Sequence, residues 1–217
     1  MKRYIILLTS VVLFWSCGLK AFEHIPEDEI PESPAIQEES SLFVQDEGAD
    51  CYVFETNETK YISETGYTLW TSNYVNESVG FQEFSARVCK LSGNKEAGYG
   101  IVFCAQKIEG KPFLLTVLIN TSGSYSVGKV TDGVFSYILT SKTAYSLNSG
   151  YGVYNTISVS HDNEKREFVL KFNDVQTDRF SISEDLVFKD SRAGFVTVIS
   201  DSDDFPENPV KVTFEKL

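Results

Sequence analysis

The sequence predicts an all-β domain built as a two-sheet antiparallel sandwich. Over residues 43–217, short runs rich in Val, Ile, Thr, Tyr and Phe are separated by clusters of Gly, Asn, Asp and Ser, which is the pattern of strands and turns. No stretch keeps a helical period in its apolar residues. Roughly a dozen such runs, spaced about 8–12 residues apart, favour a sandwich or jelly roll over a small barrel.

The clearest strand is predicted over residues 81–91, where apolar residues alternate with polar ones. Phe84, Ala86 and Val88 share one parity, so we expect these three side chains to face the core. After a short turn, the apolar run 99–106 is predicted to return beside the first strand and to form a hairpin with it.

The run 113–120 is almost continuously apolar, which is typical of a central strand that is covered on both faces. The other runs are separated from it, and from one another, by turn residues. They predict strands at 124–130, 134–140, 153–161, 166–173, 194–200 and 210–216.

Residues 1–16 have the pattern of an export signal. Lys2 and Arg3 form a charged head, an apolar run follows over residues 4–15, and the small residue Ser16 ends it. The apolar run is shorter than the ~20 residues that a membrane-spanning helix needs. We therefore expect residues 1–16 to be cleaved on export.

Residues 17–42 have the composition of a disordered acidic linker. Their Asp and Glu side chains repel one another, while Pro26, Pro31 and Pro34 oppose helix formation. The β-sandwich domain is then predicted to occupy residues 43–217, a length that suits one domain with a core of ordinary size.

The segment Leu13-Phe14-Trp15-Ser16-Cys17 resembles the lipobox of bacterial lipoproteins, in which the cysteine becomes the lipidated first residue of the mature chain. That family usually has leucine three places before the cysteine and a small residue two places before it, whereas Phe14 and Trp15 hold these positions here. The resemblance implies a lipid on Cys17 that anchors the exported chain to a bacterial membrane, facing the periplasm or the cell surface. The alternative is a plain signal peptide with an incidental cysteine.

The charge of the chain excludes one class of partner. The formal net charge is −12, and it becomes −14 when the two positive charges of Lys2 and Arg3 leave with the signal. Such a field repels phosphate-rich partners, and the sequence has no basic stripe that would overcome it. We therefore expect no nucleic-acid ligand, and we expect any membrane association to come from the lipid.

Five segments carry a resemblance to a known fold: 98–103 (GYGIVF), 124–130 (SYSVGKV), 155–159 (NTISV), 168–173 (FVLKFN) and 194–196 (GFV). In this order they resemble the concanavalin A-like lectin and glucanase superfamily, especially its laminin-G-like jelly-roll branch. The resemblance extends from Phe81 onward over some 135 residues and implies a concanavalin A-like jelly roll. Because the superfamily contains lectins, adhesion modules and glycosidases, its fold does not define an activity.

Catalytic residues are not indicated by the sequence. The glucanase branch carries Glu-x-Asp-x-x-Glu on one strand, and that motif does not occur here. Glu83 and Glu167 could form a carboxylate pair, although charged strand residues more often lie on a solvated face. His161 beside Asp162 could act as a base, but a histidine at the mouth of a turn is more often an ordinary surface residue. The alternative function is a carbohydrate-active, glycoside hydrolase-like enzyme, such as the branch that acts on 3-keto-disaccharides.

Aromatic side chains near turns are the candidates for ligand binding, because sugar rings stack their apolar faces on Trp and Tyr. These candidates are Trp70, Tyr74, Tyr137, Tyr145, Tyr151 and Tyr154. Trp70 could equally be a core residue between the sheets. On this basis we favour a non-enzymatic cell-envelope lipoprotein that binds glycan or protein.

Calcium is the one cofactor that the sequence raises. Asp201, Asp203 and Asp204 form an acidic cluster between two predicted strands, and hard cations prefer such oxygen ligands. The alternative is a solvated acidic turn, helped by Pro206 and Pro209.

Cys89 and Cys104 flank the turn at 92–98, so they could pair across the predicted hairpin as a disulfide. Cys51 would compete for that bond or stay free. The alternative is three buried thiols.

Overall fold

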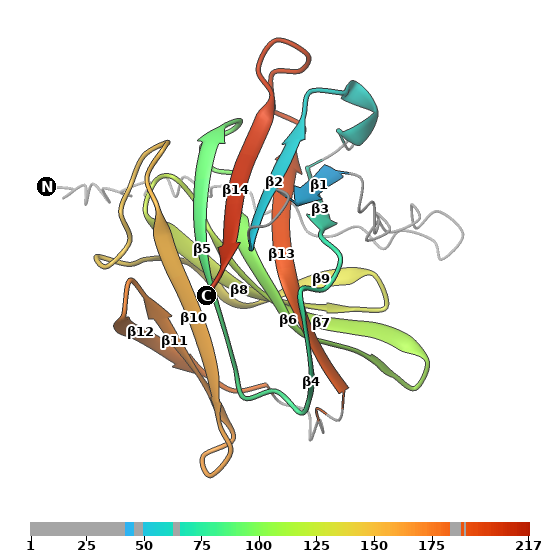
Figure 1. Ribbon diagram of the computed structural model, residues 1–217, viewed down its shortest axis with the longest axis vertical. Coiled ribbons are helices and arrows are strands. Elements are labelled where there is room, and N and C mark those ends of the chain that lie inside the picture. The colour runs from blue at the N-terminus through green and yellow to red at the C-terminus, as the bar shows by residue number, and fades with distance from the viewer. Residues whose placement is uncertain (1–41, 46–49, 63–65, 183–187, 189) are drawn as a thin grey trace, which may run out of the picture. The chain divides into compact units, whose positions relative to one another are not determined.

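The computed structural model describes residues 42–45, 50–62, 66–182, 188 and 190–217. Within these ranges the chain forms two antiparallel sheets around one apolar core (Figure 1). The predicted signal, the predicted lipidation site Cys17 and the predicted linker up to residue 41 lie outside the described residues. In the described part of the chain, no helix is both long and apolar enough to cross a membrane.

The first sheet, called the β14 sheet here, has the strand order β1-β2-β14-β5-β10-β11-β12. Its strands are β1 (Phe43–Gln45), β2 (Cys51–Thr56), β14 (Val210–Lys216), β5 (Glu83–Ser92), β10 (Asn155–Asp162), β11 (Glu167–Phe172) and β12 (Val175–Phe180). A short 3-10 helix, η3 (Thr59–Tyr61), follows β2.

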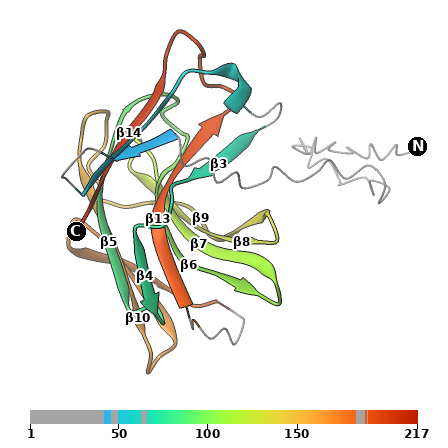
Figure 2. The ribbon, with the colours of Figure 1, turned by 45° about the vertical axis from the view of Figure 1, so that its right-hand side comes forward.

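The second sheet, called the β13 sheet here, has the order β3-β13-β6-β7-β8-β9, and β4 also pairs with β13. Its strands are β3 (Tyr67–Thr71), β4 (Asn76–Val79), β13 (Asp190–Ser200), β6 (Tyr99–Ile108), β7 (Lys111–Ile119), β8 (Ser124–Thr131) and β9 (Val134–Thr143). Figure 2 shows β6, β7, β8 and β9 running side by side next to β13.

The core lies between the sheets and confirms the predicted parity of β5. Phe84, Ala86 and Val88 are all buried in the main apolar cluster. Phe195 of β13 stacks on Phe214 of β14 with ring centroids 4.9 Å apart, so aromatic packing joins one sheet to the other. The fold class predicted from the alternation of apolar residues is therefore confirmed.

The β13 sheet has a second apolar cluster on its outer face. Leu114 of β7 belongs to this cluster, whereas its neighbours Phe113 and Leu115 belong to the main core. This arrangement confirms that β7 is covered on both faces. The outer cluster also contains Val102, Ala105, Val130 and Val196, with Leu69, Tyr74, Leu118 and Phe135 packed against it.

The predicted hairpin between the strands at 81–91 and 99–106 is wrong. In the structure β5 pairs with β14 and β10, whereas β6 pairs with β13 and β7. The connection at 93–98 crosses from one sheet to the other, because both strands have a strongly apolar face and these faces meet across the core. Two strands that are adjacent in the sequence therefore lie in opposite sheets of the sandwich.

The same crossing separates Cys89 and Cys104, for which a disulfide was one of two possibilities. Cys89 has the opposite parity from the core-facing Val88, whereas Cys104 lies in the main core at a backbone irregularity with φ of 54°. Cys51, Cys89 and Cys104 are all free thiols. Burial raises the pKa of both the Cys89 and the Cys104 thiol, so they are inert buried groups.

Candidate functional site

A groove of about 450 Å³ lies on the outer face of the β13 sheet. Its lining residues come from five strands of this sheet, β3, β13, β7, β8 and β9, and from the β5–β6 loop and the β7–β8 turn. Leu69, Leu118 and Val198 are among its apolar lining residues, and Ser126 and Ser141 contribute hydroxyl groups. The volume falls in the range of roughly 300–1,000 Å³ that is usual for small-ligand sites.

Two aromatic rings line the groove at its β9 end. Phe135 and Tyr137 pack edge to face, with ring centroids 4.9 Å apart and an interplanar angle of 89°. Gly128 of β8 makes room for them, because a Cβ at this position would lie 2.2 Å from Cε2 of Phe135. Tyr137 remains 58% exposed, so its ring is available to a ligand.

Tyr67 is the aromatic ring at the opposite end, on β3, and is 52% exposed. It has the same parity as Leu69, whereas Thr68 and Trp70 are buried. The preceding Gly66 donates its backbone N–H to Oδ2 of Asp201 at 2.8 Å, which ties the start of β3 to the end of β13. The groove therefore has one exposed tyrosine at each end.

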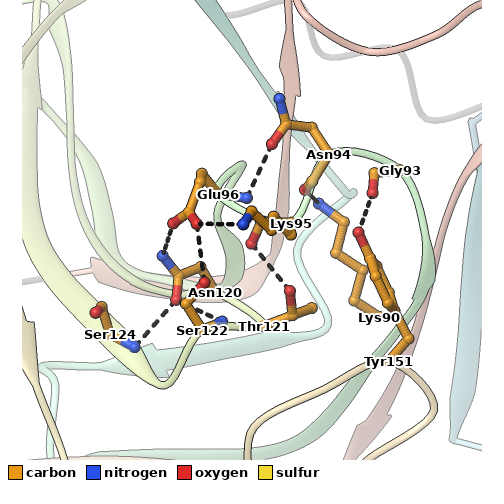
Figure 3. A network of polar contacts seen from close by, with 10 residues as sticks. All are labelled: Lys90, Gly93, Asn94, Lys95, Glu96, Asn120, Thr121, Ser122, Ser124 and Tyr151. Atoms are coloured by element: carbon orange, nitrogen blue, oxygen red, sulfur yellow. Dashed lines mark hydrogen bonds and ion pairs between the residues drawn. The ribbon is translucent and has the colours of Figure 1, made fainter.

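Glu96 supplies the carboxylate at the rim of the groove, in the loop that joins β5 to β6 (Figure 3). Asn120 donates its side-chain amide to Oε2 of Glu96 at 3.0 Å, and the hydroxyl of Ser122 donates to Oε1 at 2.9 Å. Oδ1 of Asn120 also accepts the backbone N–H groups of Ser122 and Ser124. These bonds join the β5–β6 loop to the β7–β8 turn and hold the carboxylate in place.

A buried lysine supports the loop that carries Glu96. The ammonium of Lys90 donates to the carbonyl oxygen of Asn94 at 2.6 Å (Figure 3). It also donates to the carbonyl oxygen of Ala97 at 2.9 Å, and Asn94 and Ala97 flank Glu96 in the sequence. Asp203 accepts the backbone N–H of Asn94 at 2.6 Å. Burial lowers the pKa of Lys90 to about 8, and the charge of Asp203 opposes that shift.

Of the six predicted ligand residues, the structure brings only Tyr137 to the groove lining among the described residues. Trp70 is 3% exposed and packs edge to face on Tyr61 in the core, which is the alternative that the sequence left open. Tyr74 is half-buried, and the Arg192 guanidinium lies over its ring at 4.6 Å.

The other three tyrosines are exposed but lie elsewhere. Tyr145 projects fully into solvent from a loop. Tyr151 lines a separate hollow of about 360 Å³ and donates its hydroxyl to the carbonyl of Gly93. The Arg87 guanidinium lies over the ring of Tyr154 at 4.9 Å. Three aromatic residues of the groove lining were not predicted: Tyr67, Phe135 and Tyr125, which is a residue of the main core.

The three aspartates considered for calcium do not converge on one point. Asp201 accepts the backbone N–H of Gly66. Asp203 accepts the backbone N–H groups of Asn94 and Ser200. Asp204 accepts the side-chain amide of Asn208 at 2.7 Å. Each carboxylate thus stabilises a different stretch of loop. Across the described ranges, no group of three His, Cys, Asp or Glu side chains could hold a metal ion.

The weaker catalytic candidates are also outside the groove. Glu83 and Glu167 lie on β5 and β11 of the β14 sheet, and Glu167 is 3.6 Å from the Arg179 guanidinium. The ring of His161 packs on Phe168 with centroids 4.8 Å apart, and its Nδ1 is hydrogen-bonded to Asn163. Glu167 and His161 therefore have structural contacts with neighbouring residues of the β14 sheet and the adjoining loop.

Solved structures share this fold at low sequence identity. A native glycosidic hydrolase is 9% identical, with a TM-score of 0.55 over 81% of this chain and 79% of that chain. A family 16 endo-glucanase from Bacteroides ovatus is 10% identical, with a TM-score of 0.52 over 81% and 84%. Carbohydrate-binding module CBM66 from Bacillus subtilis is 14% identical, with a TM-score of 0.45 over 70% and 84%. No protein-family model and no curated protein sequence matches the chain.

The fold is a concanavalin A-like jelly roll, an all-β sandwich of two antiparallel sheets. The glycosidic hydrolase and the family 16 endo-glucanase share this fold. At these identities the likeness defines the fold alone, so the function has to be argued from the groove.

Proposed function

We propose that this protein is a non-enzymatic binding module that takes a glycan in the groove of the β13 sheet. The observation that carries the proposal is an apolar groove with an exposed tyrosine at each end, Tyr67 and Tyr137. Pyranose rings have apolar faces that stack on such aromatic rings, and tyrosine loses little conformational entropy on binding. The hydroxyl and carboxylate groups between the tyrosines suit the edges of the same sugar rings.

The length of the groove favours an oligosaccharide over a single sugar. Tyr67 and Tyr137 stand on strands that are five strand intervals apart. At about 4.8 Å per interval, the path along the curved sheet is about 24 Å. A ligand that contacts both tyrosines therefore has to be several sugar rings long.

The single carboxylate among the described lining residues favours binding over hydrolysis. A glycosidase of the usual kind needs two carboxylates roughly 5–10 Å apart on either side of the scissile bond. Among the described residues that line the groove, Glu96 is the only Asp or Glu. This is the specific reason for preferring a binding module to the hydrolase-like alternative.

Replacing Tyr137 by alanine tests the glycan site. We expect wild-type protein to bind neutral oligosaccharides on a glycan array without hydrolysing them, and we expect Tyr137→Ala to weaken that binding about tenfold, because one stacking contact is lost. Tyr145→Ala is the matched control, since this exposed tyrosine lies outside the groove and its loss should leave the affinity unchanged. Release of reducing ends from any bound glycan would instead favour the enzyme.

We also propose that the chain is a bacterial lipoprotein of the cell envelope, tethered through Cys17. The support is the sequence of residues 1–42, with its charged head, apolar run, lipobox-like segment and acidic linker. Mass spectrometry of the exported protein is expected to find an acylated Cys17, and Cys17→Ser should remove both the added mass and the partition into detergent. An unmodified Cys17 in wild-type protein would leave the plain signal peptide as the correct interpretation.

A further inference from the structure

We infer that the groove selects uncharged glycans and rejects acidic ones, and that Glu96 is the residue that makes this selection. The inference rests on the glycan-binding function proposed above and adds the chemical class of the ligand. It follows from the charges at the groove, from the hydrogen bonds that Glu96 has already formed, and from the acceptor sites that these bonds leave free.

The charges at the groove are of one sign. Among its described lining residues, Glu96 is the only charged side chain, and none is Lys, Arg or His. At the Tyr67 end, the exposed Asp201 adds a second negative charge one residue beyond Ser200, the strand partner of Tyr67. The hydrogen bond from the Gly66 amide lowers the pKa of Asp201, so this carboxylate stays ionised.

Lys95, which is paired with Glu96, does not neutralise this arrangement. Lys95 lies with its ammonium 3.9 Å from Oε1 of Glu96, but its side chain is 69% exposed. An ion pair in water at this distance is weak and is screened by salt. An acidic sugar in the groove would therefore meet Glu96 without a cation among the lining residues to bind it.

The hydrogen bonds of Glu96 leave it able to accept from a ligand. A carboxylate has about four acceptor sites. One donor to each oxygen is supplied by Asn120 and Ser122, at 3.0 and 2.9 Å. The remaining sites suit sugar hydroxyls, which are donors, and oppose a uronate carboxylate or a sulfate, which are acceptors. Because Asn120 and Ser122 fix the position of Glu96, little ordering is needed when a hydroxyl binds.

The test compares matched neutral and acidic hexasaccharides. The probes are gluco-, manno- and galacto-hexasaccharides, each beside the uronic acid oligomer of the same linkage, titrated at low salt by calorimetry. We expect wild-type protein to prefer the neutral member of the bound pair by about tenfold, because at low salt Glu96 repels the uronate charge and no lining cation offsets this repulsion. This preference should shrink as salt is added, while the affinity for the neutral member stays constant.

Glu96→Gln keeps the size of the side chain and removes its charge. We expect this variant to lose most of the preference, mainly by gaining affinity for the acidic hexasaccharide. Glu77→Gln is the matched control, because it makes the same change on exposed β4, outside the groove lining, and should keep the wild-type preference. Thermal unfolding of both variants checks that the fold is retained.

The outcomes separate the proposed glycan binding from the proposed selectivity for uncharged glycans. Equal or tighter binding of the acidic oligomers by wild-type protein would overturn the selectivity while leaving glycan binding intact. An unchanged preference in Glu96→Gln would overturn the role of Glu96 in the same way. Absence of binding to every hexasaccharide, by wild-type protein and variant alike, would overturn the glycan function and the selectivity together.

Discussion

Gly128→Ala is expected to abolish most glycan binding and to lower the free energy of unfolding by about 1–3 kcal/mol. The new Cβ would lie 2.2 Å from Cε2 and 2.4 Å from Cζ of Phe135, and 2.9 Å from the hydroxyl oxygen of Thr116. The Phe135 ring has to swing away, because a separation this short is not tolerated. Tyr137 packs edge to face on Phe135 and would lose its support, so the β9 end of the groove would be rebuilt.

Two variants separate this local effect from a general loss of stability. Gly133 lies in the β8–β9 turn with a φ of 82° and no atom within 4 Å of a Cβ, so Gly133→Ala strains the backbone but leaves the groove intact. It should unfold more easily and still bind. Combining Gly128→Ala with Phe135→Leu relieves the collision, so the double variant should be more stable than the sum of the two single changes predicts. Strict additivity in denaturant titrations would contradict the proposed contact.

Alternation of apolar residues was enough to predict the strands that form the core. In β5 the residues of one parity are buried, as expected, because a strand with one apolar face can bury it in only one orientation. The continuous apolar run of β7 correctly indicated two covered faces. These predictions succeeded because they depend on side chains within one strand.

Pairing between strands could not be read in the same way. A short connection predicted a hairpin between β5 and β6, yet the β5–β6 loop spans the sandwich. Both arrangements bury the same apolar residues, so the choice depends on which partner strands arrive from distant parts of the chain. Here β14 and β10 occupy the two edges of β5, and no local pattern marks them as its neighbours.

The groove residues also differ in whether they could be predicted from one strand or depend on the pairing of distant strands. Tyr137 was predicted from its exposed, turn-rich surroundings, whereas Tyr67, Phe135 and Glu96 were not predicted, because β3, β9 and the β5–β6 loop meet only through the order of strands in the β13 sheet. The burial of Trp70 did have a signal in the sequence. Tyr67 and Leu69 share the outward parity, so Trp70 has to point into the core.

Lys90→Met is expected to lower the free energy of unfolding at pH 7 by about 1–3 kcal/mol and to weaken glycan binding with it. The carbonyl oxygens of Asn94 and Ala97 would lose the ammonium that they share, and both flank the residue that presents its carboxylate to the groove. Methionine keeps the length of the side chain, so packing is largely preserved. Glu77→Gln, which alters a charge on exposed β4, should leave both stability and binding close to wild type.

The dependence of stability on pH shows whether the pKa of Lys90 is lowered in the folded protein. Burial lowers the pKa of Lys90 from 10.5 to about 8, so between these values the unfolded chain holds a proton that the folded chain has released. Stability therefore rises with pH over this interval, and the cost of burying the charge is present in full only below pH 8. Buried tyrosines and thiols also titrate at high pH, but they are common to both proteins. The difference in unfolding free energy between wild type and Lys90→Met should accordingly widen from pH 8 to pH 10.5. A difference that stays constant would mean that Lys90 keeps its proton in the fold, held by the two carbonyl groups and by Asp203.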